Sequence, residues 1–276
     1  MSEIQYQVAK TVKEAVKMMQ AAKGKGYVLA GGTDLLVQMK SGMRAPGVIV
    51  DVKKIPEMTT VVEKKGSFTI GAATPAAVLG ENKKLKKAWP GVIEAANLIG
   101  STQVQGRASM GGNLCNASPA ADGVPPLLAL DAEVEIASRR GVRRIALGAF
   151  ITGNRRTVLA PDELVTAVLV PRVDHPARSA FAKLGARRYL VISIAMAAAT
   201  LEVDGGRIVR ARVAVGACSA VARRLSALEQ DLGGAPIDRS LVERVGPVHV
   251  APLAPIDDMR GSAAYRQDAV LTLLRR

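Results

Sequence analysis

Residues 109–130 read SMGGNLCNASPAADGVPPLLAL, a stretch rich in small and amide-bearing residues that ends in an apolar, helix-like run. Its first half gathers glycine, serine and asparagine around a lone cysteine, and Asp122 is the one charged residue of the whole stretch. Small residues let a ligand approach the backbone closely, and free N–H groups ahead of a helix suit an anion. Cys115 alone is also compatible with a metal site or a nucleophile. The rest of the chain has to distinguish these interpretations.

The composition describes an ordinary globular chain with a basic surface. Its 276 residues can bury a substantial core and suggest two or three lobes, with 49% hydrophobic and 22% charged residues. Aromatic residues make up only 3%, which argues against a nucleic-acid platform built on base stacking. The net charge of +14 is spread along the chain, as in NKKLKKAW and SRRGVRR. We interpret it as a solvated surface or a docking face for acidic subunits, and expect no nucleic-acid partner.

Targeting and redox signals point to the cytoplasm. The N-terminus MSEIQYQVAK lacks a signal-peptide pattern, and the longest apolar stretch, from Tyr189, is too short to span a bilayer. The two cysteines, Cys115 and Cys218, are far apart and form neither a disulfide framework nor a paired metal-ligand motif. His175 and His249 are isolated, so we expect no metal site.

The order of patterns predicts an α+β protein in three parts. Residues 11–26 suggest an amphipathic helix, in which Thr11 and Glu14 have capping-box spacing. Hairpins are expected at Lys65-Gly66, within residues 132–147, and at residues 204–206. Further helices are expected over 75–88, 91–100, 125–132, 221–232 and 263–276. We expect domains at residues 1–57, 58–172 and 173–276.

Two glycine loops suggest a phosphate clamp. Residues Gly31–Asp34 lie between an expected strand and a helix, and Ser109–Asn113 form a second loop in another lobe. Neither matches a dinucleotide fingerprint or a P-loop, and a single Gly-Gly turn is commonly only a turn. Two such loops facing each other would hold a pyrophosphate, which favours a dinucleotide between the lobes. Asp122 would accept a hydrogen bond from a ribose hydroxyl or serve as a helix N-cap.

An ordered set of motifs resembles a known family. VLAGGTDLLVQMK, TIGAATP, the stretch at 109–130, FAKLGARR and GACSAVARRLSALE are together similar to the FAD-binding medium subunit of molybdenum hydroxylases. That family includes carbon monoxide, nicotinate and xanthine dehydrogenases. The resemblance runs from about residue 4 to the end. It implies two α/β lobes forming an FAD cleft of the vanillyl-alcohol-oxidase or PCMH type, with a smaller C-terminal α+β domain covering the flavin.

The resemblance also implies cofactor-binding residues, with FAD held non-covalently. Leu164 and Val165 would contact the ring system, and Lys183 would stabilise negative charge on the reduced ring. Cys115 would be a neighbour of the flavin or a small packing residue. The full implied set is Val28, Leu29, Ala30, Gly31, Gly32, Thr33, Asp34, Leu35, Gly100, Val104, Ala108, Ser109, Gly111, Gly112, Asn113, Cys115, Asp122, Leu164, Val165 and Lys183.

The implied role is an electron relay without catalytic side chains of its own. A molybdopterin-binding large subunit and a [2Fe-2S] small subunit would be partners, arranged as a dimer of heterotrimers, with molybdenum cofactor and clusters only in those partners. Two distant cysteines do not match the four-cysteine cluster loop of some branches. Two alternatives remain: a stand-alone FAD-dependent oxidoreductase of the same superfamily that oxidises a small alcohol, and a basic scaffold with a degenerate FAD site. The sequence leaves the substrate and the terminal acceptor open.

Overall fold

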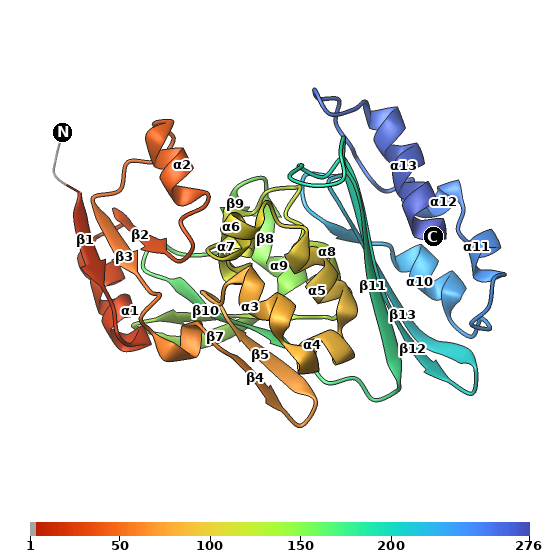
Figure 1. Ribbon diagram of the computed structural model, residues 1–276, viewed down its shortest axis with the longest axis horizontal. Helices are drawn as coiled ribbons and strands as arrows, with labels where there is room; N and C mark the ends of the chain where they lie inside the picture. The colour runs from red at the N-terminus through yellow and green to blue at the C-terminus, as the bar shows by residue number, and fades with distance from the viewer. Residues whose placement is uncertain (1–3) are drawn as a thin grey trace.

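The computed structural model describes residues 4–276 and begins with a small parallel sheet (Figure 1). Its strands lie in the order β1–β3–β2, and helix α1 connects β1 to β2. The Thr11 hydroxyl accepts a hydrogen bond from the Glu14 N–H (3.1 Å), so α1 begins where the capping pattern predicts. The elements of this first lobe are β1 Gln5–Val8, α1 Val12–Ala21, β2 Gly26–Leu29, α2 Leu35–Lys40, β3 Val48–Asp51 and η1 Pro56–Met58.

The second lobe is built on a five-stranded antiparallel sheet in the order β4–β5–β10–β6–β7. The predicted hairpin at Lys65-Gly66 is present, and both residues have positive φ (51° and 81°), as a tight two-residue turn requires. The predicted hairpin within residues 132–147 is also present. The strands of this lobe, with a separate two-stranded ribbon β8–β9, are β4 Val61–Lys64, β5 Ser67–Gly71, β6 Glu133–Ser138, β7 Gly141–Ala146, β8 Ile151–Gly153, β9 Arg156–Thr157 and β10 Leu164–Val170.

Short helices fill the second lobe and correct two sequence-based expectations. The helix predicted over 75–88 is divided at Asn82, because its side chain accepts a hydrogen bond from the Leu85 N–H (2.9 Å) and starts a new helix. The predicted loop Ser109–Asn113 is largely the first turn of α7, with Ser109 as its N-cap. The helices are α3 Ala76–Glu81, α4 Lys83–Ala88, α5 Pro90–Asn97, α6 Thr102–Gln105, α7 Met110–Asn116, α8 Val124–Leu128 and α9 Leu147–Phe150.

The C-terminal domain is a four-stranded antiparallel sheet covered by helices on one face. Its order is β11–β12–β13–β14. The predicted helix over 221–232 starts only at Ser226, because Arg223–Arg224 pair with β13 as strand β14. The elements are β11 Ala177–Leu184, β12 Ala195–Asp204, β13 Arg207–Gly216, β14 Arg223–Arg224, α10 Ser226–Leu232, α11 Leu241–Arg244, α12 Pro247–Val250 and α13 Ala263–Arg275.

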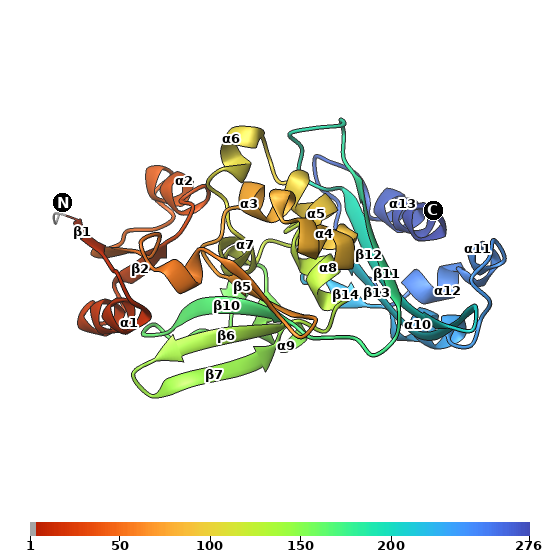
Figure 2. The ribbon, with the colours of Figure 1, turned by 60° about the horizontal axis from the view of Figure 1, so that its bottom comes forward.

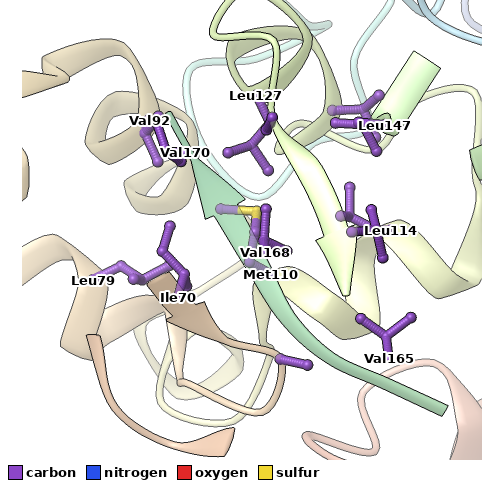
Figure 3. Close-up of a cluster of buried hydrophobic side chains, with 14 of the residues drawn as sticks. Ile70, Leu79, Val92, Met110, Leu114, Leu127, Leu147, Val165, Val168 and Val170 are labelled. Atoms are coloured by element: carbon purple, nitrogen blue, oxygen red, sulfur yellow. The ribbon is translucent and has the colours of Figure 1, made fainter. Parts of the chain in front are cut away.

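Alternating side chains let the C-terminal sheet join two hydrophobic cores. Met196 and Ala198 pack into the core shared with the first two lobes, whereas Ala195 and Ala197 pack beneath α10 and α13. Figure 2 shows α5 and α8 between the five-stranded sheet and the C-terminal sheet. The shared core is drawn in Figure 3, where Met110 and Leu114 of α7 point toward Val165 and Val168 of β10. This core contains residues of all three expected domains. The domain boundaries expected after residues 57 and 172 therefore stay a prediction.

Two arginines of the C-terminal sheet hold the end of α8. Arg212 donates to the Ala129 carbonyl (3.0 Å) and to Glu202 (2.6 Å), and both of these charged side chains are 3% exposed. Arg224 donates to the Leu128 carbonyl (3.2 Å) and to Asp131 (2.6 Å). The last carbonyls of a helix lack hydrogen-bond donors within the helix, and here arginines of the neighbouring domain supply those donors.

We expect Arg212→Met to lower the free energy of unfolding by about 3 kcal/mol, because Glu202 would lose its buried cation. The double variant Arg212→Met/Glu202→Met should lose less, since both charges are then removed. Urea denaturation measures the three proteins, and Arg210→Met, exposed on the same strand, is the matched control. Equal losses in the single and double variants would contradict the buried pairing.

Candidate functional site

A cavity of about 540 Å³ lies where the first two lobes meet. Its size falls within the range of about 300–1,000 Å³ that is usual for small-molecule sites. The first lobe contributes β2, the turn after it and α2, and the second contributes α7 and the loop before β10. Sixteen of the expected residues line it: Val28, Ala30, Gly31, Gly32, Thr33, Asp34, Leu35, Val104, Ala108, Ser109, Gly111, Gly112, Asn113, Cys115, Leu164 and Val165.

Four expected residues lie outside the lining. Leu29 is buried within the first lobe, and Gly100 has a positive φ of 57° and packs against Val104. Asp122 and Lys183 are paired with each other instead of facing the cavity wall. The roles expected for these four therefore rest on the resemblance.

Each glycine segment makes a close backbone approach to a neighbouring part of the chain. A Cβ on Gly31 would overlap the backbone carbonyl of Arg107 and would lie 2.9 Å from the Cα of Ala108. On the other side, a Cβ on Gly111 would lie 2.5 Å from the carbonyl oxygen of Ala72. Only glycine permits these approaches. The first brings the β2–α2 turn against the residues just before α7, and the second seats the start of α7 against the residue that follows β5.

The β2–α2 turn presents unpaired donors. Among residues 4–276, the backbone N–H groups of Gly32, Thr33 and Asp34 have no acceptor within the protein. Gly32 has a φ of +73°, which an L side chain rarely adopts. Gly112 is exposed, and a Cβ there would contact only the Ser109 hydroxyl, at 3.1 Å. Three consecutive free donors beside an open glycine form a wall suited to a negatively charged group.

A polar chain that sequence reasoning missed ties α2 to α7. The Asn116 side-chain oxygen accepts from Gln38 (2.9 Å) and from Arg155 (2.7 Å). Arg44 donates to Gln38 (3.2 Å) and lies over the Tyr27 ring, 5.5 Å from its centroid. Except for Arg155, these residues line the cavity. No local motif marks them, because the contact between Gln38 and Asn116 joins two lobes.

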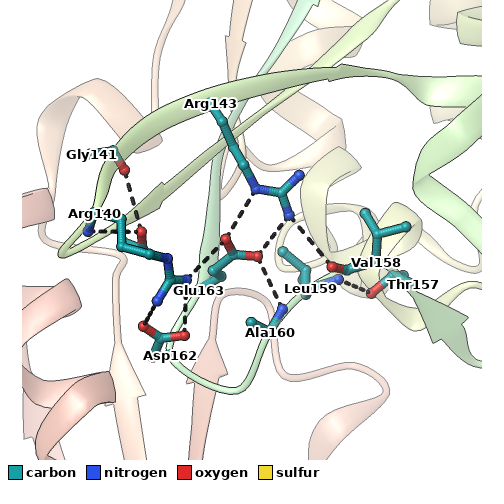
Figure 4. A network of polar contacts seen from close by, with 10 residues as sticks. Arg140, Gly141, Arg143, Thr157, Val158, Leu159, Ala160, Asp162 and Glu163 are labelled. Atoms are coloured by element: carbon teal, nitrogen blue, oxygen red, sulfur yellow. Dashed lines mark hydrogen bonds and ion pairs between the residues drawn. The ribbon is translucent and has the colours of Figure 1, made fainter.

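Glu163 holds the loop that closes another side of the cavity (Figure 4). Its oxygens accept from Arg143 (2.7 and 3.0 Å), from Arg140 (3.3 Å) and from the Ala160 N–H (3.0 Å). The hydrogen bond from Arg143 is the main reason that the pKa of Glu163 is lowered to about 2. The carboxylate stays ionised at neutral pH and fixes Leu159–Pro161 in the cavity wall.

Asp122 links the C-terminal domain to α7. Its carboxylate accepts from Lys183 (2.6 Å) and Ser193 (2.5 Å), and burial raises its pKa while these two partners oppose the rise. The next residue, Gly123, donates its N–H to the side-chain oxygen of Asn113 (3.1 Å) in the cavity. The expected N-cap role is absent, because Gly123 is the residue that precedes α8.

The surroundings of both cysteines disfavour the thiolate form. Cys115 faces the cavity, and the protein atoms around its sulfur desolvate the thiolate and raise the pKa to about 12. Burial also raises the pKa of Cys218 to about 11. Neither thiol is an activated nucleophile at neutral pH.

Within residues 4–276, no cluster of three His, Cys, Asp or Glu side chains is arranged to hold a metal ion. No helix in the same range is long and apolar enough to cross a membrane.

Comparison with known families identifies the fold. Residues 2–173 match the model described as the FAD binding domain in molybdopterin dehydrogenase. The chain belongs to this family. Residues 180–276 match the CO dehydrogenase flavoprotein C-terminal domain. The expected family and its oxidoreductase class are thereby confirmed.

Individual relatives agree over nearly the whole length. The nicotinate dehydrogenase FAD-subunit of Eubacterium barkeri is 28% identical and covers 100% of this chain and 95% of its own. The putative xanthine dehydrogenase FAD-binding subunit of Escherichia coli is 30% identical, and the match covers 98% of this chain and 93% of that subunit. A solved carbon monoxide dehydrogenase from Hydrogenophaga pseudoflava superposes with a TM-score of 0.91 at 26% identity, covering 99% and 95%. The reconstituted enzyme from Oligotropha carboxidovorans gives 0.93 at 27%, covering 99% and 96%. These matches confirm the expected α+β fold.

The ion pairs of Glu163 predict a pH dependence of stability. Its pKa falls from 4.5 to about 2 on folding, so its contribution is fully present above pH 4.5 and is lost as pH falls toward 2. We expect Glu163→Gln to remove about 2 kcal/mol at neutral pH and to flatten the profile in that acid window. Chemical denaturation at a series of pH values measures this. Parallel profiles for the variant and wild type would exclude the assignment.

Proposed function

We propose that the cavity binds FAD non-covalently and that the chain relays electrons within a molybdenum-containing hydroxylase. The observation that carries this proposal is that two glycine segments line one cavity, one of them with three free N–H groups and packed by Gly31 against the residues just before the other. Family membership supplies the identity of the cofactor. The wall supplies a physical reason, because a pyrophosphate needs several donors and a backbone that it can approach closely.

The residues present fit such a dinucleotide. Gly32, Thr33 and Asp34 would donate backbone hydrogen bonds to the pyrophosphate, while Gly112 leaves the facing side open. Leu164 and Val165 give the cavity an apolar wall against which a ring system would pack. Lys183 would act from the C-terminal domain through its ion pair with Asp122, whose neighbour Gly123 is hydrogen-bonded to Asn113 in the cavity lining.

The chain itself contributes position, polarity and exclusion of water. The flavin, when bound, supplies the ability to exchange electrons singly or in pairs. The large and small partner subunits of such a medium chain would carry the molybdenum cofactor and the [2Fe-2S] clusters, as a dimer of heterotrimers. The cytoplasm is the proposed compartment, since two distant cysteines offer no disulfide framework.

Gly112→Val tests the clamp. The new side chain would project into space that the proposed pyrophosphate needs, while meeting little protein. We expect FAD content to fall at least about ten-fold, a loss of roughly 1.4 kcal/mol or more in binding. Flavin absorbance and chromatography of the heat-released cofactor measure the occupancy.

The matched control for this variant is Gly148→Val on α9. Gly148 is exposed outside the cavity, and a Cβ there would only contact Leu128 at 3.8 Å. It should retain wild-type FAD content and unfold at a similar denaturant concentration. Full occupancy in Gly112→Val would refute a phosphate site beside α7.

Lys183→Met tests the expected influence of the C-terminal domain on the flavin. Removing the cation leaves Asp122 buried without its ion-pair partner, so the charge near Asn113 changes while the cavity walls remain. We expect the flavin potential to shift with FAD still bound. Spectroelectrochemical titration measures the potential, and an unchanged value with an unchanged acceptor rate would remove Lys183 from the mechanism.

A further inference from the structure

A dense group of cations lies on the second lobe, apart from the cavity. We define the α4 lysine surface as the exposed cations of helix α4, of the β4–β5 turn and of the segment after β10: Lys64, Lys65, Lys83, Lys84, Lys86, Lys87 and Arg172. The Lys84 ammonium lies 3.0 Å from Glu63 on β4, so helix and hairpin are adjacent. Arg172 packs beside the turn glycine Gly66. Figure 1 shows the hairpin and α4 on the same side of the molecule.

The arrangement is electrostatically unfavourable in the isolated chain. Lys83 and Lys84 are the first two residues of α4, where the helix dipole disfavours cations. Lys83 also faces Lys86 and Lys87 at spacings of three and four residues, and like charges at these spacings destabilise a helix. Among the described residues, Lys84 alone of the seven cations has an ion-pair partner within the chain. A glutamate at position 83 or 84 would suit the first turn of α4 better than a lysine.

Protection of a sheet edge explains only part of this surface. Strand β4 is the edge of the five-stranded sheet, and lysines near an edge discourage pairing with another sheet. That reason applies to Lys64 and Lys65. It does not apply to α4, whose lysines lie on a helix beside the edge strand.

We propose that the α4 lysine surface docks an acidic face of a partner subunit. This inference rests on the proposed function, in which the chain works only with other subunits. A protein fits better than a nucleic acid, because Glu63, Glu81 and Asp174 lie among or next to the cations and would repel a continuous phosphate backbone. The aromatic residue that follows the lysine run, Trp89, is 3% exposed and is not available for base stacking.

Complementary charge between the α4 lysine surface and the partner subunit would orient the two proteins as they meet and speed their association. Opposed carboxylates would relieve the repulsion within α4 and compensate the unfavourable position of Lys83. The association should therefore weaken as salt screens the charges, over a Debye length of about 10 Å at 0.1 M ionic strength.

The test uses the full chain co-produced with its partner subunits. The variant Lys83→Glu/Lys86→Glu/Lys87→Glu reverses three charges and leaves the pair between Lys84 and Glu63 intact. The control Lys10→Glu/Lys13→Glu/Lys17→Glu makes the same charge change on and beside α1, where all three lysines are exposed. FAD, iron and molybdenum are measured per chain after affinity purification, at low salt and at about 0.5 M NaCl.

We expect the α4 variant to retain FAD while its co-purifying iron or molybdenum per chain falls about ten-fold. The control variant should keep wild-type FAD, iron and molybdenum. Wild-type metal content in the α4 variant would overturn the docking assignment. Loss of binding to a short DNA duplex or to anionic vesicles, with the complex intact, would also overturn it. A wild-type chain that carries FAD but no partner metals would overturn the relay role itself, and the docking inference with it.

Discussion

The structure depends on one close approach, that of Gly31 to the backbone of Arg107 and Ala108. Any side chain at position 31 would push the two lobes apart, because the obstacle is backbone and cannot move as a rotamer does. The same approach aligns the turn after β2 with the start of α7. The polar chain from Gln38 to Asn116 then ties the far ends of α2 and α7 together. The cavity is thus held at two points, one steric and one hydrogen-bonded.

The C-terminal domain contacts the second lobe at both ends of α8. At the start of the helix, Lys183 and Ser193 hold Asp122, and at its end Arg212 and Arg224 hold the carbonyls of Ala129 and Leu128. Gly123 carries the restraint onward to Asn113 in the cavity wall. The C-terminal sheet is therefore connected to the cavity wall by a short path of hydrogen bonds and one peptide bond, although none of the described lining residues comes from that sheet.

Local patterns predicted much of the fold, and contacts between distant residues account for what they missed. The cap at Thr11 and the turn at Lys65-Gly66 are decided within a few residues, so the sequence predicts them well. Strand β14 forms only because Arg223 and Arg224 meet β13, and no local periodicity reveals that pairing. The two glycine segments were recognisable as small-residue turns. The network around Glu163 was not, because Arg140 and Arg143 lie about twenty residues away, in the β6–β7 turn and on β7.

The acid–base groups of the cavity favour a relay over direct oxidation of an alcohol. An enzyme that oxidises an alcohol at a flavin needs a base that can take the hydroxyl proton. Of the described residues that line the cavity, Asp34 and Glu163 carry the carboxylates, and no histidine is among them. Glu163 is fully engaged by Arg143, Arg140 and the Ala160 N–H, and its pKa of about 2 makes it a poor base. Asp34 is exposed and lies in the turn whose free N–H groups suit an anion. A phosphate bound to those N–H groups would occupy the space beside Asp34 that a substrate hydroxyl would need. These two carboxylates therefore support the proposed relay better than direct oxidation of an alcohol at this cavity.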